Sequence, residues 1–200
     1  MKKKHIAVLM VTLLLIAGWT FRYVTINTYY DSLTTNSKEI YMIGDVVPFE
    51  NDMGEMWVNL NGYAVKVEHF EILNTEAYIR SLNLEAYEYR TLGEKVALVY
   101  ITLSNENSDA EGVMLTDFSL RGIDNIVNMD WDLLAASNPV LQGNYGISLS
   151  PGTNYNLILP YTLQEEYFST WTWNHIENYN MYLRMTISPT EKVIQVQLRN

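Results

Sequence analysis

The chain has 200 residues, of which 48% are hydrophobic and 12% are aromatic, and its formal net charge is −10 at pH 7. Such an apolar and aromatic composition excludes a disordered chain. The acidic balance excludes binding to nucleic acid through phosphate contacts, because like charges repel. The chain has no cysteine, which excludes disulfides, thiolate metal sites and lipid attachment through a cysteine.

Residues 1–24 have the pattern of a transmembrane signal anchor. Lys2, Lys3 and Lys4 precede an uncharged apolar run, Ile6–Phe21, and Arg22 closes it. The 19 residues from position 6 to 24 would span about 28 Å as a helix, close to the hydrocarbon thickness of a bilayer. The lysines predict a cytoplasmic N-terminus and an extracellular C-terminal domain at the cell membrane. The alternative is a cleaved signal peptide, although no suitably spaced pair of small residues follows the run.

A polar segment at residues 25–39 is interpreted as a juxtamembrane spacer, and residues 40–200 as one extracytoplasmic domain. Within that domain, alternating apolar residues separated by turn residues predict strands. A change of phase near Glu68–His69 predicts a β-bulge. The strands are expected at residues 40–49, 63–72, 96–103, 113–120, 155–159, 181–187 and 194–198.

Two stretches are expected to form short helical insertions. Thr75–Leu82 follows a capping candidate at Asn74, and Asp130–Ala136 ends before Asn138 and Pro139. The resulting fold class is all-β: an immunoglobulin-like antiparallel β-sandwich with one or two short helical insertions, preceded by one N-terminal transmembrane helix.

Several turn and strand motifs occur in an order that resembles a known group of proteins. They are Tyr41–Gly44, Val99–Asn105, Asp117–Leu120, Asn138–Pro139, Leu149–Gly152, Leu159–Tyr161 and Ser188–Pro189. The chain resembles the uncharacterised immunoglobulin-like domains of anchored, exported proteins in Gram-positive bacteria. The resemblance implies a sandwich held at the membrane, and it implies no catalytic residue or cofactor.

Two oxygen-rich segments are candidate calcium sites. The first has Asn105, Asn107 and Asp109 at alternate positions, but it lacks the glycine and glutamate of an EF-hand loop. The second contains Asp124, Asp130 and Asp132. A polar hairpin loop and an aspartate helix cap are the competing interpretations of the two segments.

Trp171, Trp173 and His175 alternate along the chain. In a strand, their rings would share one face, as a platform for stacking sugar rings requires, or they would pack into the core. His69 and His175 offer too few ligands for zinc, and the adjacent Glu165 and Glu166 would point apart in a strand. Nothing in the sequence identifies a cofactor site or a catalytic residue.

These observations favour a noncatalytic module that contacts a protein partner at the cell envelope through exposed loops or a strand edge. The alternative is a ligand-binding domain for a cell-wall glycan or calcium. A hydrolase is a third possibility, with only scattered residues to support it.

Overall fold

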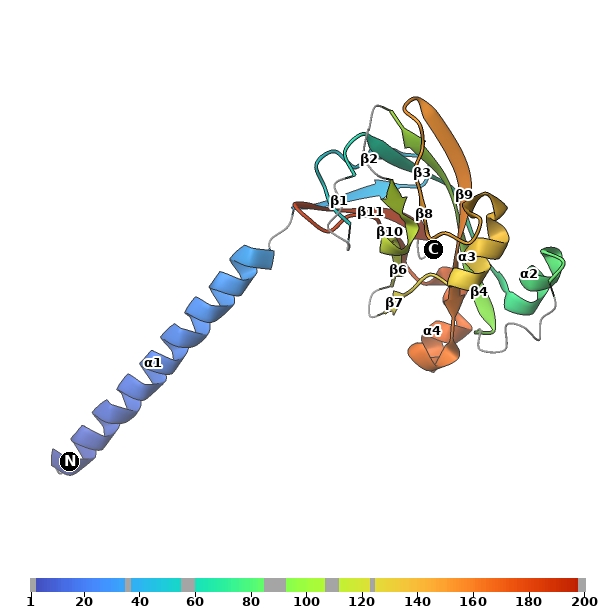
Figure 1. The fold of residues 1–200 in the computed structure, drawn as a ribbon. Coiled ribbons are helices and arrows are strands. Elements are labelled where there is room, and N and C mark those ends of the chain that lie inside the picture. Colours follow the sequence, from blue (N-terminus) through green and yellow to red (C-terminus); the bar gives the residue numbers. More distant parts are fainter. Residues whose placement is uncertain are drawn as a thin grey trace. The chain divides into compact units, whose positions relative to one another are not determined.

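The computed structural model describes residues 3–34, 37–54, 60–84, 93–106, 112–122 and 125–197. It divides into two compact units, Met1–Asn36 and Ser37–Asn200 (Figure 1). Three of the calcium candidates, Asn107, Asp109 and Asp124, lie outside the described residues.

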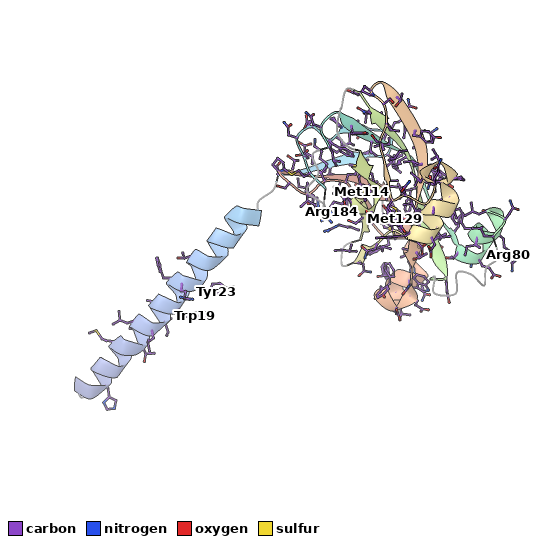
Figure 2. All side chains as sticks on the ribbon, in the orientation of Figure 1. Trp19, Tyr23, Arg80, Met114, Met129 and Arg184 are labelled. Carbon is purple, nitrogen blue, oxygen red and sulfur yellow. The ribbon has the colours of Figure 1, made fainter. Side chains whose placement is uncertain are left out.

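The first unit contains a single helix, α1 (Lys3–Thr34). It continues through most of the predicted spacer, because no glycine or proline between residues 25 and 34 stops it. Trp19 and Tyr23 stack one turn apart, with ring centroids 5.5 Å from each other (Figure 2). No helix in the described part of the chain combines the length and the apolar character that a membrane crossing requires.

The second unit begins at residue 37, three residues before the predicted start of the domain. Its larger sheet has five strands in the order β1-β11-β10-β6-β7. Their bounds are β1 Ser37–Met42, β6 Ser119–Arg121, β7 Ile126–Val127, β10 Met181–Arg184 and β11 Thr190–Gln197.

The other main sheet has four strands in the order β2-β3-β4-β9, and β5 and β8 form a separate pair. The bounds are β2 Val46–Pro48, β3 Tyr63–Asn74, β4 Lys95–Asn105, β5 Val113–Met114, β8 Gly146–Ile147 and β9 Thr153–Leu163. β4 lies between β3 and β9, as the continuous apolar run at residues 96–103 predicts (Figure 1).

The hydrophobic core lies between the two main sheets, which confirms a mostly-β, sandwich-like domain. One sheet contributes Val65, Val99, Ile101, Leu103 and Leu159, and the other contributes Leu120, Leu183, Ile194 and Val196. These side chains are at most 4% exposed. Their burial supplies the main stabilisation of the domain.

One pairing departs from the predicted antiparallel arrangement. β1 runs parallel to β11, with Ser37 opposite Thr190 and Met42 opposite Gln195. The two strands lie at opposite ends of the domain sequence, so no tight hairpin forces them to run antiparallel.

The predicted strand at residues 113–120 is wrong as one element. It is divided into β5, a 3₁₀ turn η2 (Leu115–Asp117) and β6. The turn brings Leu115 and Phe118, three residues apart, to the same side, and both are fully buried. Strand alternation would have left one of them outside the core.

Both predicted helices and the bulge are confirmed. α2 (Thr75–Ser81) is capped by Asn74, and α3 (Trp131–Ser137) is capped by Asp130. The ladder between β3 and β4 shifts its register between Val67 and His69, so Glu68 is the additional residue of a bulge.

α2 and α3 lie against the outer face of the four-stranded sheet. Tyr78 and Ile79 of α2 and Leu133 of α3 pack on Val96 and Leu98 of β4. The described part of the chain also contains the short helices η3 Pro139–Leu141, η4 Glu165–Tyr167, α4 Thr170–Asn174 and η5 Ile176–Asn178. The outer face is thus covered along one half of β4, and Tyr100 and Thr102 on the other half stay partly exposed.

Candidate binding groove

An open groove of about 530 Å³ lies where α3 begins, beside the end of β9. We call it the acidic groove. It is lined by Ile126, Val127, Asn128, Met129, Asp130, Trp131, Asp132, Thr162, Gln164, Tyr167 and Phe168. Among the described residues, this lining combines aromatic rings and two carboxylates, without a lysine, arginine or histidine.

The first turn of α3 fixes the position of Asp130 in the acidic groove. The Asp130 Oδ1 atom accepts a hydrogen bond of 3.0 Å from the Leu133 amide, so this carboxylate is the N-cap of the helix. Its backbone amide is held by the Pro160 carbonyl at 2.9 Å. Burial raises the pKa of Asp130, and the nearby charge of Asp132 raises it further. Asp130 therefore shapes the groove and also stabilises α3.

The aromatic rim of the acidic groove is exposed to solvent. Trp131 is 50% exposed, and its ring lies 4.4 Å from the ring of Tyr145. Tyr167, on η4, is 63% exposed. Large exposed rings beside carboxylates can bind a cation through both charge attraction and the negative ring face. The arrangement is suited to an ammonium or guanidinium group.

The strand in which Trp171, Trp173 and His175 would share one face is wrong. Residues 170–174 form the helix α4, because the Ser169 hydroxyl accepts the Thr172 amide at 3.1 Å and caps it. Trp173 points inward, is 6% exposed and packs against Phe168. Trp171 and His175 lie one turn apart, and their rings stack at 4.8 Å. Of the three rings, Trp171 and His175 lie together at the surface, and Trp173 is buried.

Of the calcium candidates in the first segment, only Asn105 lies within the described residues. Asn105 is buried at the end of β4, and its amide donates to the Leu149 carbonyl at 2.7 Å. It joins the end of β4 to the chain that leads into β9, as a structural residue would. Among the described residues, no three histidine, aspartate or glutamate side chains gather closely enough to hold a metal ion. The calcium hypothesis for residues 105–109 stays a prediction.

A second cavity, of about 430 Å³, lies on the outer face of the four-stranded sheet, next to the end of α3. Its lining includes Glu68, Tyr100, Thr102, Asn138 and Asn156. Sequence reasoning placed the bulge at Glu68 but did not recognise this cavity. Its residues come from three strands and a helix, so no local motif could have marked them.

The fold and the acidic groove define a β-sandwich domain with an open, ligand-sized surface groove. The chain belongs to the family described as "Domain of unknown function (DUF5028)", which matches residues 38–192. The family match confirms the expected resemblance to an uncharacterised domain.

Two solved structures are similar to this chain, and both come from Gram-positive bacteria. The yjhA protein from Bacillus subtilis is 11% identical, with a TM-score of 0.44, and the match covers 78% of this chain and 98% of that one. A functionally unknown protein from Listeria monocytogenes EGD-e is 14% identical, with a TM-score of 0.41, and the match covers 79% and 90%. No curated protein matches the chain.

Proposed function

We propose that this protein is a noncatalytic, membrane-anchored module that binds a basic segment of another protein at the outer face of the cell membrane. The acidic groove is the contact surface. The observation that carries the proposal is the combination of Trp131 and Tyr167, both at least half exposed, with Asp130 and Asp132 in one groove. Tryptophan and tyrosine anchors are typical of the residues that dominate binding energy at protein interfaces.

The charge of the surroundings favours a lysine or an arginine side chain as the occupant. Glu165 and Glu166 on η4 are exposed directly before Tyr167, and they add to the charge of the two aspartates. A basic side chain could lie over the Trp131 or Tyr167 ring while its charge faces Asp132. The net charge of −10 would also draw such a partner toward the domain.

The N-terminal helix serves as the anchor in this proposal. Ile6–Phe21 is uncharged, and the lysines before it favour a cytoplasmic N-terminus. Along α1, Leu14, Leu15 and Phe21 are each at least 70% exposed, as lipid-facing side chains would be. Within the extracellular domain, the two facing sheets with mostly antiparallel ladders support an immunoglobulin-like arrangement.

Site-specific photo-crosslinking in cells tests the proposed contact. A photoreactive amino acid replaces Tyr167 in the full-length protein, and captured proteins are identified by mass spectrometry. The matched control replaces Tyr155, which is 41% exposed at the other end of β9. We expect one reproducible envelope protein from position 167 and not from position 155. Capture of the same proteins at both positions would contradict the proposal.

Calcium is the second candidate ligand of the acidic groove, because Asp130 and Asp132 both line it. Thermal unfolding of the full-length protein in calcium and in EDTA separates the two candidates. A higher melting temperature in calcium that Asp132→Asn abolishes would support a calcium site. Equal melting temperatures would leave the basic segment as the candidate occupant.

A further inference from the structure

The β3 bulge places a polar side chain over the uncovered half of the outer sheet face. Glu68 is the additional residue between Val67, which faces inward opposite Ile101, and His69, which faces outward opposite Tyr100. We call the surface formed by Glu68, His69, Tyr100, Thr102 and Asn156 the bulge face. Glu68, Tyr100, Thr102 and Asn156 line the 430 Å³ cavity described above, and the His69 ring lies beside Tyr100.

Hydrogen bonds connect the polar groups of the bulge face. The Thr102 Oγ1 atom lies 2.9 Å from Glu68 Oε1 and 2.9 Å from Asn156 Oδ1. The hydroxyl carries one proton, so it can donate to only one of these two oxygens at a time. The other oxygen keeps its capacity to accept a hydrogen bond from a ligand hydroxyl.

The charge of Glu68 is neutralised locally. Its Oε2 atom lies 2.7 Å from Lys66 Nζ, and this pair is partly exposed. Hydrogen bonds from Lys66 and Thr102 lower the pKa of Glu68, so the carboxylate stays an acceptor at neutral pH. Because its charge is paired with Lys66, the Glu68 carboxylate can, like the Asn156 amide, form hydrogen bonds with the hydroxyls of an uncharged polar ligand.

Tyr100 supplies a partly exposed ring at the centre of the bulge face. Its hydroxyl donates to Glu71 Oε1 at 2.7 Å, and its ring lies 5.6 Å from the His69 ring. Burial and the hydrogen bond to Glu71 raise the pKa of Tyr100, so it remains a neutral phenol. The ring is thus held at one edge and can pack its face against an apolar ligand surface.

The end of α3 forms a fixed wall beside these groups. The Asn138 amide donates to the Leu134 and Ile158 carbonyls at 2.8 and 2.7 Å, and its oxygen accepts the Ile158 amide at 2.8 Å. The Ser137 hydroxyl lies 2.6 Å from the Tyr78 hydroxyl. Because their hydrogen bonds lie within the domain, these residues shape the cavity, and Glu68 and Asn156 remain the groups available to a ligand.

We propose that the bulge face binds a neutral sugar ring of a glycan. The apolar C–H face of the sugar would pack on Tyr100, and its hydroxyls would donate to Glu68 and accept from or donate to Asn156. This site is separate from the acidic groove and does not depend on the protein contact proposed for it. The module would then hold a glycan on one surface and a protein on another.

Binding is measured by isothermal titration of the full-length chain in lipid nanodiscs, which avoids detergents that carry sugar headgroups. The probes are a soluble hexamer of β-1,4-linked N-acetylglucosamine and a hexamer of β-1,4-linked glucose. We expect saturable binding of at least one hexamer. Comparing the two probes shows whether the acetamido group contributes to recognition.

Matched variants locate the site. Glu68→Gln is expected to weaken binding about tenfold or more, because it removes a charged hydrogen-bond acceptor. Glu191→Gln is the control, because Glu191 also pairs with a lysine, Lys38 at 3.6 Å, but lies on the other sheet. Tyr100→Phe keeps the ring, so we expect it to bind within about threefold of the wild type. Melting temperatures show whether each variant is folded.

Two results would overturn the proposal. One is that neither hexamer binds to the folded wild-type protein. The other is equal affinity of Glu68→Gln and Glu191→Gln, which would place any sugar binding away from the bulge face. Trp131→Ala, in the acidic groove, should leave sugar binding unchanged. Sugar binding at the bulge face and protein binding at the acidic groove are thus tested by different variants, and either proposal can fail without the other.

Discussion

The Lys192 ammonium lies 2.8 Å from the Asp52 carboxylate, and the two side chains are 1% and 5% exposed. Lys192 also donates to the Pro48 carbonyl and to Glu50, each at 2.7 Å. Asp52 in turn accepts the Thr190 amide at 3.0 Å. This buried pair joins β11 of the five-stranded sheet to the chain that follows β2 of the other sheet.

Replacing Lys192 is expected to destabilise the protein strongly. Lys192→Met leaves Asp52 as a buried charge without its counterion, which costs about 3–5 kcal/mol of unfolding free energy. Lys38→Met is the control, because Lys38 is 51% exposed in its ion pair with Glu191, and such pairs contribute about 1 kcal/mol or less. Urea unfolding of both variants measures the difference. Similar losses would show that the buried pair is not important for stability.

The same pair predicts a loss of stability at alkaline pH. Burial alone would lower the pKa of Lys192, but its hydrogen bonds to Asp52 and Glu50 outweigh burial and raise it above 10.5. The stabilisation is therefore fully present below pH 10.5, the ordinary value, and is lost as the pH rises through the folded-state pKa. Unfolding midpoints across this range should fall more steeply for the wild type than for Lys192→Met. Parallel curves would contradict the assignment.

Asn138 is expected to be important for the attachment of α3 to β9. It is 4% exposed, and its side chain bonds to both the amide and the carbonyl of Ile158. Asn138→Ala leaves buried backbone groups without partners, so we expect a loss of about 3 kcal/mol of unfolding free energy. Asn144→Ala, at an exposed position, should change it by less than about 0.5 kcal/mol. A small effect of Asn138→Ala would mean that water replaces the amide.

Removal of the α3 cap should have a moderate effect. Asp130→Ala removes the acceptor for the Leu133 amide and should cost about 1 kcal/mol. Asp132→Ala, in the exposed first turn of the same helix, should cost about 0.5 kcal/mol or less. Chemical unfolding of the two variants measures both values. If Asp132→Ala were the more harmful change, the cap would be assigned to the wrong aspartate.

Local sequence signals were sufficient to predict those elements whose structure is determined by residues close together in the chain. Asn74 and Asp130 marked the starts of α2 and α3, because a helix cap is formed within a few residues. The change of phase at Glu68–His69 marked the bulge, because inward and outward side chains must alternate along a strand. Alternation gave a wrong prediction at residues 170–174. Trp171, Trp173 and His175 alternate as in a strand, but this segment forms a helix capped by Ser169.

The sequence by itself determined the sandwich-like β domain, because period-two hydrophobicity is a local property that any packed sheet must satisfy. It could not determine that β1 pairs in parallel with β11, since this pairing joins two segments about 150 residues apart in the sequence. It also could not bring Glu68, Thr102 and Asn156 together. Those three residues lie on three different strands, and only the tertiary ladders of β3, β4 and β9 place them in one surface.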